Sequence, residues 1–187
     1  MENEVLQTER LIMRPWRESD AEALYEYASD PRIGPAAGWP PHESVEESRR
    51  IIREVLACAE TYALVLKGQE RPIGCISLVI GEKGGHNMGP KGAEIGYWVG
   101  VPFWGQGLVP EAVTKLLHRS FDELGLETIW CGYYDGNEKS RRVQEKCGFS
   151  YHHTKLGTFC PLVNETRTEH LSCITKEQWQ GLTAGTV

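Results

Sequence analysis

Hydrophobic and polar positions along this chain predict short strands separated by amphipathic helices. A first strand is predicted over Thr8–Arg14, and the capping-box pattern Ser19-Asp20-Ala21-Glu22 predicts a helix that ends near Ala28. The segment from Arg32 to Glu43 is rich in glycine and proline and therefore predicts no regular structure. A second capping-box pattern, Ser44-Val45-Glu46-Glu47, predicts another helix directly after it.

The rest of the chain predicts a hairpin followed by alternating strands and helices. The hairpin is Thr61–Leu66 with Pro72–Ile80, and the five glycines from Gly81 to Gly92 predict a loop, either a hairpin tip or a gate over a cleft. Later strands are predicted at Ala93–Val99, Thr128–Tyr134, Phe149–Leu156 and Arg167–Thr175, and later helices at Pro110–Leu124 and Asn137–Lys146. This order predicts an α/β (α+β) fold with a mixed sheet and helices on its faces.

Length and charge limit the protein class. A chain of 187 residues with no linker or repeat predicts a single domain, residues 1–187, with its core at about 8–175. The net charge of −6 argues against direct nucleic-acid binding, because phosphate backbones require a basic face, and it is compatible with a cationic substrate. The acidic N-terminus and the lack of a long apolar run predict a cytoplasmic protein with no membrane association.

Cysteine and histidine spacing predicts no metal cofactor. The six cysteines contain no C-x-x-C pair, which favours buried, reduced thiols over disulfides or a zinc site. His152 and His153 are adjacent on a predicted strand, so their side chains are expected on opposite faces. This placement argues against a metal site shared by the two histidines.

The candidate chemistry lies in the segment from Glu94 to Ala112, which predicts a strand, a glycine turn and a helix start. Gly105 and Gly107 carry no side chain, so a phosphate group can approach the backbone there. The first N–H groups of a helix carry partial positive charge and bind anions. No Lys-Ser or Lys-Thr pair follows, unlike in nucleoside-triphosphate loops, and the acidic residue of a dinucleotide-binding unit is not placed correctly.

Three separated blocks resemble the GNAT superfamily of acyl-CoA-dependent N-acyltransferases, specifically the ribosomal-protein alanine N-acetyltransferase (RimJ/RimL) type. They are Thr8-Glu9-Arg10-Leu11-Ile12-Met13-Arg14-Pro15-Trp16 followed by Asp20, Trp104-Gly105-Gln106-Gly107-Leu108-Val109, and Asn137-Glu138-Lys139-Ser140-Arg141-Arg142-Val143-Gln144-Glu145-Lys146-Cys147-Gly148-Phe149. The resemblance implies a mostly antiparallel sheet of six to seven strands. Its fourth and fifth strands, here Ala93–Val99 and Thr128–Tyr134, are expected to splay apart. Trp104, Val109 and Pro110 depart from the family's loop pattern.

The resemblance also implies acetyl-CoA as cosubstrate and assigns its contacts. The pyrophosphate is expected on the backbone N–H groups of Gly105, Gln106, Gly107, Leu108 and Val109. The main chains of Val99 and Val101 are expected to contact the pantetheine, with an oxyanion donor near Val99. Asn137 and Ser140 are expected to face the cofactor from one helix, although Asn137 is equally suited to cap that helix.

The predicted catalytic residues are Ser140 and Glu94. Many family members place a proton-donating tyrosine where this chain has Gln144, and the resemblance points to Ser140 instead. Glu94 is predicted as a base, often acting through water, or as a strand-edge carboxylate that pairs with a nearby Arg or Lys. Tyr97 and Trp39 are predicted to line the acceptor site, with packing beneath its own loop as the alternative for Trp39. His42 is expected to satisfy a loop hydrogen bond.

The acceptor predicted by the resemblance is a protein N-terminal α-amine that attacks the thioester directly. A small amine, such as an amino acid, a polyamine or an antibiotic, is the first alternative, and a non-catalytic acyl-CoA-binding module is the second. The resemblance also suggests a homodimer that forms through the last strands.

Overall fold

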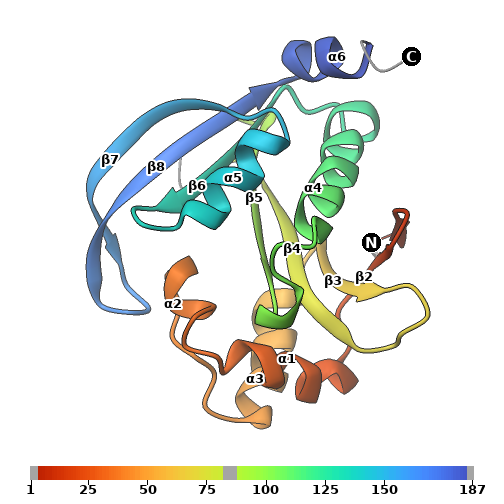
Figure 1. Cartoon of the computed structure of the whole chain (residues 1–187), viewed down its shortest axis with the longest axis vertical. Coiled ribbons are helices and arrows are strands. Elements are labelled where there is room, and N and C mark those ends of the chain that lie inside the picture. The colour runs from red at the N-terminus through yellow and green to blue at the C-terminus, as the bar shows by residue number, and fades with distance from the viewer. Residues whose placement is uncertain (1–3, 82–87, 185–187) are drawn as a thin grey trace. The chain divides into compact units, whose positions relative to one another are not determined.

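The structure is a computed structural model that describes residues 4–81 and 88–184 (Figure 1). Its strands form an eight-stranded sheet in the order β1-β2-β3-β4-β5-β6-β8-β7. The strands are β1 (Leu6–Gln7), β2 (Leu11–Arg14), β3 (Thr61–Leu66), β4 (Pro72–Ile80), β5 (Gly92–Val99), β6 (Thr128–Tyr134), β7 (Ser150–Cys160) and β8 (Glu165–Thr175). The α-helices are α1 (Ala21–Ala28), α2 (Gly34–Ala37), α3 (Val45–Ile51), α4 (Leu108–His118), α5 (Glu138–Lys146) and α6 (Lys176–Ala184).

The sheet is mixed and mostly antiparallel, which confirms the predicted fold class. Neighbours β1 and β2, β2 and β3, β3 and β4, and β6 and β8 pair in the antiparallel sense, whereas β5 and β6 are parallel. The sheet has eight strands instead of six to seven. The two-residue strand β1, which pairs Leu6 with Met13, is too short to leave an alternating pattern in the sequence.

The chain divides into two compact units. Unit 1 comprises residues 1–77, 97–112 and 160–165, and unit 2 comprises residues 78–96, 113–159 and 166–187.

Unit 1 has a core in which helices pack on the early strands. In Figure 1, α1 lies beside α3, and the two helices are in contact. The buried cluster consists of Trp16, Ala21, Leu24, Ala28, Ile52, Ala63 and Cys75. Burial of such side chains is the main favourable contribution to folding.

Unit 2 is organised around β6, β8 and α5. Seven residue pairs join β6 to β8, from Thr128 with Thr175 to Tyr134 with Glu169, and α5 packs on β6. At the C-terminal end, the indole of Trp179 stacks on Phe121 at a centroid distance of 6.1 Å and meets the ring of His118 edge-on at 4.7 Å. These aromatic contacts fix α6, a helix that the sequence patterns did not predict.

The early part of the chain departs from the predicted boundaries at three points. Thr8–Arg10 form a turn instead of strand, because the Thr8 N–H donates to the Leu11 carbonyl at 3.0 Å and the Leu11 N–H donates to Thr8 Oγ1 at 2.9 Å. The first capping interaction uses Asp20, whose carboxylate accepts the Arg17 N–H at 2.9 Å, instead of the Ser19 box. The segment Arg32–Glu43 does contain regular structure, the short helix α2, because Pro35 at its N-terminal end is compatible with a first helical turn.

Later boundaries differ as well. Helix α4 begins at Leu108, two residues before the predicted Pro110, and the helical chain continues beyond His118 as a π-helical turn, Arg119–Glu123. Strands β7 and β8 are longer than predicted. Part of the predicted Gly81–Gly92 loop, residues 82–87, lies outside the described residues.

The predicted buried thiols are confirmed for four cysteines and wrong for Cys58. The six cysteines form no disulfide among the described residues; Cys75, Cys131, Cys147 and Cys160 are buried, Cys173 is half-buried and Cys58 is exposed. Cys58 lies in the bend that follows the π-helical turn Ile52–Leu56.

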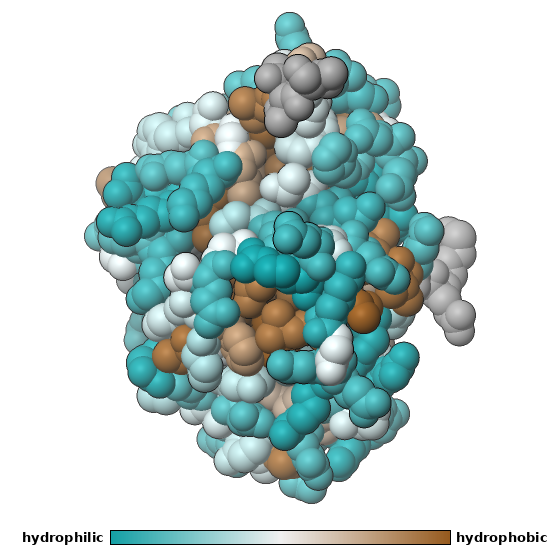
Figure 2. Space-filling view, turned by 45° about the vertical axis from the view of Figure 1, so that its right-hand side comes forward, coloured by the Kyte–Doolittle hydropathy of each residue, from teal (hydrophilic) through white to brown (hydrophobic). Residues whose placement is uncertain are grey.

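The face of the molecule drawn in Figure 2 is mainly polar. Figure 2 shows one face, on which hydrophobic residues form separate patches among hydrophilic ones. No helix in residues 4–81 or 88–184 combines the length and apolar character that a membrane span requires.

Candidate functional site

The glycine turn of unit 1 connects β5 to α4. A short 3₁₀ turn, Val101–Phe103, leads into it, and Gly105 and Gly107 adopt left-handed φ angles of 74° and 75°. Only glycine takes up this conformation without strain. Because α4 begins at Leu108, the N–H groups of Leu108 and Val109 belong to its first turn, where a helix offers them no internal partner.

Side-chain bonds brace this turn against the residues before it. The Trp104 indole Nε1 donates to the Val99 carbonyl at 3.0 Å, and the Gln106 amide Nε2 donates to the Pro102 carbonyl at 2.8 Å. Trp104 therefore has a local structural role at the position where it departs from the family pattern. Pro110 is the third residue of α4, one of the first four positions, so its missing N–H breaks no intrahelical bond. Such a braced turn can bind a phosphate group.

Residues far away in the sequence hold the same turn, and no local sequence pattern predicts this role. Arg10 donates from Nη1 to the Gln106 carbonyl at 2.8 Å and from Nε to Glu111 Oε2 at 2.6 Å. Thr8 donates to the other oxygen of Glu111. Thr8 and Arg10 stood in the first motif block, so that block was the available signal.

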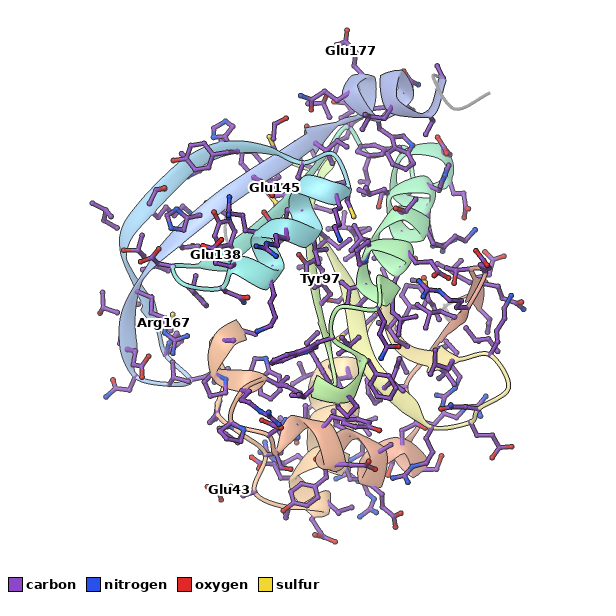
Figure 3. All side chains as sticks on the ribbon, viewed as in Figure 1. Glu43, Tyr97, Glu138, Glu145, Arg167 and Glu177 are labelled. Carbon is purple, nitrogen blue, oxygen red and sulfur yellow. The ribbon has the colours of Figure 1, made fainter. Side chains whose placement is uncertain are left out.

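Trp39 packs inside unit 1. Its ring lies 5.4 Å from that of His42 and 6.0 Å from that of Trp98, and it covers the edge of the buried cluster. Trp39 is thus packed against its own segment and is half-buried. A role of Trp39 or of the half-buried Tyr97 (Figure 3) in acceptor binding stays a prediction.

His42 makes the loop hydrogen bond that was expected of it. Its Nδ1 lies 2.8 Å from the Ser48 hydroxyl oxygen. Burial lowers the pKa of His42, although the charge of Glu47 opposes this shift. The neutral form is therefore favoured at neutral pH.

In unit 2, the β5–β6 ladder places Glu94. The pairs are Gly92 with Thr128, Ala93 with Ile129, and Glu94 with Trp130. The described ladder ends at Glu94, which is half-buried. Partners in register project to the same face, so Glu94 and Trp130 share one face.

Helix α5 and its N-cap bring Asn137, Ser140 and Gln144 together. The Asn137 side-chain oxygen accepts the Ser140 N–H at 3.2 Å, which confirms its capping role. The side chain of Gln144 is buried and donates from Nε2 to the Gly132 carbonyl at 3.3 Å and to Ser140 Oγ at 3.4 Å. Gln144 Oε1 is a buried acceptor with no hydrogen-bond partner among the described residues.

Charges on the outer face of α5 are paired with one another. Arg141 bonds to Glu138 and Glu145, both labelled in Figure 3, at 2.6 Å and 2.9 Å. The hydrogen bond to Glu138 raises the pKa of Arg141. Glu138 and Glu145 are exposed, so this network contributes little to stability.

A buried carboxylate of β8 that was not among the predicted site residues lies beside β6. Glu169 is 9% exposed, and a Cβ atom at Gly132 would lie 2.9 Å from its Oε1. Gly132 therefore leaves room for this carboxylate. A glycine inside an otherwise apolar strand pattern was the available signal.

The expectation for His152 and His153 is wrong. Their Nδ1 atoms lie 2.8 Å apart, and the two rings lie 4.8 Å and 6.3 Å from the ring of Trp130. Both side chains turn toward the same indole, which overrides ideal strand alternation on a strand at the edge of the sheet. No group of three or more possible metal ligands occurs within residues 4–81 and 88–184, and the predicted absence of a metal stays a prediction.

Comparison with known proteins identifies the family. A model described as "Acetyltransferase (GNAT) domain" matches residues 10–150. The chain belongs to the GNAT acetyltransferase family.

Individual proteins agree with this assignment. "Uncharacterized N-acetyltransferase YoaA" of Bacillus subtilis is 31% identical over 147 residues, 78% of this chain and 82% of YoaA. "Putative ribosomal N-acetyltransferase YdaF" of the same organism is 42% identical over 66 residues, 34% of this chain and 36% of YdaF.

A solved structure supports the fold. A GNAT-family acetyltransferase from Bacillus anthracis superposes with a TM-score of 0.80 at 24% identity, covering 93% of this chain and 99% of its own. The predicted GNAT resemblance and the identification as an N-acetyltransferase are confirmed. Enzymes of this family use acetyl-CoA as the acetyl donor.

Proposed function

We propose that this GNAT enzyme transfers the acetyl group of acetyl-CoA to a protein N-terminal α-amine. The donor half of the proposal depends on one observation, the braced glycine turn with Gly105 and Gly107 in left-handed conformation before α4. The acceptor half is supported by the similarity to YdaF, whose name designates a ribosomal N-acetyltransferase, and by the motif resemblance.

Residues of unit 1 fit the pyrophosphate and the pantetheine arm. The N–H groups of the turn and of Leu108 and Val109 supply donors for the pyrophosphate oxygens. The main chains of Val99 and Val101 are proposed to contact the pantetheine amides, with an N–H near Val99 as the oxyanion donor. The Val99 carbonyl already accepts the Trp104 indole, so it retains only its second lone pair for a ligand.

Residues of unit 2 are proposed to manage the protons. The amine nitrogen forms a bond to the thioester carbonyl carbon, the carbon–sulfur bond breaks, the amine loses a proton and the thiolate gains one. Glu94 is proposed to accept the amine proton, and Ser140 to donate to the sulfur. The Gln144 amide donates to Ser140 Oγ, which stabilises developing negative charge on that oxygen.

An α-amine requires only a weak base. Its pKa of about 8 leaves part of it neutral at pH 7, whereas a lysine side chain with a pKa near 10.4 is almost fully charged. A carboxylate such as Glu94 is therefore sufficient for an N-terminal acceptor.

The acceptor is tested by thiol release from acetyl-CoA over a panel of peptides and small amines. We expect turnover with free peptide N-termini and none with the same peptides blocked at the N-terminus but carrying a lysine. Faster turnover of an amino acid, a polyamine or an amine antibiotic would replace the proposed acceptor. Tight acetyl-CoA binding with no turnover of any acceptor would remove the proposed reaction.

The proton donor is tested by Ser140→Ala. We expect kcat to fall by roughly 100-fold with little change in the KM for acetyl-CoA, because a proton donor acts at the transition state. Arg142→Ala is the matched control, since Arg142 is an exposed residue of the same helix. A Ser140→Ala rate equal to that of the control at every pH would eliminate Ser140 as the donor.

A further inference from the structure

Arg10 connects the turn before β2 to the glycine turn before α4, within unit 1. Its backbone N–H and its Nε bond to the two oxygens of Glu111 at 2.8 Å and 2.6 Å, and its Nη1 bonds to the Gln106 carbonyl at 2.8 Å. One guanidinium group thus joins a carboxylate of the first turn of α4 to a peptide group of the turn. A planar fork of donors suits this double contact, and a lysine ammonium does not reproduce it.

Glu111 is held in place from several directions. Its Oε1 accepts the Thr8 hydroxyl, and its own N–H donates to the Gly107 carbonyl at 3.3 Å. Partial burial raises the pKa of Glu111, but the bonds from Thr8 and Arg10 outweigh that effect, and the net pKa lies below its usual value. Glu111 therefore stays ionised at neutral pH, and its side chain is only 18% exposed.

The bond from Arg10 to the Gln106 carbonyl determines the direction of the next N–H group. The described peptide bonds are all trans. In a trans peptide the carbonyl and the following N–H point in opposite directions. The Gly107 N–H therefore points away from the Arg10 guanidinium, and the Gln106 side chain, bonded to the Pro102 carbonyl, limits rotation from the other end.

We propose that Arg10, held by Glu111, is a positioning residue that fixes the Gln106–Gly107 peptide so that the Gly107 N–H faces the pyrophosphate of acetyl-CoA. The inference rests on the proposed function of the glycine turn. Without Arg10 this peptide can turn its carbonyl oxygen toward the anion, which replaces an attractive dipole with a repulsive one. A donor oriented before the ligand arrives avoids that loss.

The competing explanation is that the Arg10–Glu111 pair only stabilises unit 1. A stability role would reduce activity with every acetyl donor by a similar factor. A positioning role would reduce activity only with donors that carry a pyrophosphate. S-acetylpantetheine, which ends before the pyrophosphate, separates the two explanations.

The kinetic test compares acetyl-CoA with S-acetylpantetheine in Arg10→Met, Arg10→Lys and Glu111→Gln. We expect Arg10→Met to raise the KM for acetyl-CoA at least about tenfold, the effect of losing one hydrogen bond to a charged group, with little change in kcat. Its kcat/KM for S-acetylpantetheine should stay within about twofold of that of the wild type, since that donor does not meet the displaced N–H. Arg10→Lys should not rescue, and Glu111→Gln should show a smaller effect in the same direction. The control is Arg71→Met, which removes an exposed arginine of unit 1 paired with Glu26.

A spectroscopic readout does not depend on turnover. Coenzyme A added to ¹⁵N-labelled wild-type protein should shift the Gly107 amide resonance, and the shift should be lost in Arg10→Met but kept in Arg71→Met. An equal loss of activity with both donors, or a Gly107 shift of the same size in Arg10→Met, would overturn the inference. Wild-type protein that turns over acetyl-CoA with no Gly107 shift would also overturn it and leave the proposed function intact. Wild-type protein that neither binds coenzyme A nor releases thiol would contradict the proposed function itself.

Discussion

At the residue scale, the Arg14–Asp20 pair is a buried ion pair on which the stability of unit 1 depends. The two side chains are 9% and 7% exposed and are joined by two bonds of 2.7 Å and 2.8 Å. Arg14 also donates to the carbonyls of Pro15 and Glu70, so its guanidinium is well satisfied only while Asp20 is present. Removing one partner of a buried pair leaves the other charge buried and uncompensated.

We therefore expect Asp20→Ala to lower the free energy of unfolding by about 3 kcal/mol or more. Chemical denaturation measures this change. The matched control is Glu26→Gln, which breaks the exposed Arg71–Glu26 pair and should change stability by less than about 1 kcal/mol. Equal effects of the two variants would show that the Arg14–Asp20 pair contributes no more than a surface pair.

Residue roles set by the local backbone could be predicted from the sequence, and roles set by distant partners could not. Asn137 and Ser44 each precede a helix and cap it as predicted, with bonds to Ser140 and Glu47. Arg10 meets Glu111 across 101 positions, and nothing near either residue indicates the other. The opening motif marked Thr8 and Arg10 as notable but could not state what they touch.

At the element scale, propensity located helices and strands well and placed some of their ends incorrectly. Strand β6 has the predicted bounds, because its glycine and polar flanks are clear stop signals. Helix α4 begins at Leu108, two residues before the predicted start at Pro110. Gly107 adopts a left-handed φ angle directly before Leu108, so the helix can begin there and Pro110 is not its first residue. Helix α2 was missed because four residues are too few for a periodic pattern.

Replacement of Gly34 and of Gly181 by alanine should change the stability of the protein in opposite directions. A Cβ at Gly34 of α2 would lie 2.5 Å from the Trp39 ring and 2.6 Å from its backbone oxygen, whereas nothing lies within 4 Å of a Cβ at Gly181 of α6. We expect Gly34→Ala to destabilise the protein by roughly 1–3 kcal/mol through this overpacking and to change the fluorescence of the displaced Trp39. Gly181→Ala should stabilise the protein by about 0.5–1 kcal/mol, because alanine loses less conformational freedom in a helix. Thermal unfolding of both variants measures the sign of each change in stability. A stabilising Gly34→Ala would contradict the close contact of Gly34 with Trp39.

At the scale of the whole molecule, fold class followed from the order of elements, and strand order did not. One strand-helix-strand unit flanked by hairpins was sufficient to predict a mixed sheet. Strand β8 pairs with β6, and β7, which precedes β8 in the chain, lies at the edge of the sheet. No local pattern predicts this order, because both strands are long and half-exposed. The three motif blocks supplied the family, since each contains glycines or caps whose backbone geometry fixes the residue type.

The distribution of cysteines gives a test of the folded state as a whole. Burial raises the pKa of Cys75 to about 12 and that of Cys147 to about 11. At pH 8 the thiolate fraction of a thiol with the pKa of Cys75 is on the order of 10⁻⁴, and the thiolate is the form that alkylating reagents attack. Cys58 is exposed. Iodoacetamide at pH 8 should therefore label Cys58 of the native protein first, with Cys75, Cys131, Cys147 and Cys160 protected.

Mass spectrometry of peptides taken at successive times measures this order. In denaturant all six cysteines should react. Without denaturant a buried cysteine reacts only in molecules that have opened, so its labelling rate reports the population of these molecules. The core cysteines should lose protection together in Asp20→Ala, because that variant lowers the free energy of opening, and they should stay protected in the Glu26→Gln control. Labelling of Cys75 in the native wild-type protein as fast as Cys58 would show that the core of unit 1 is open to solvent, contrary to the burial described for the Trp16–Cys75 cluster.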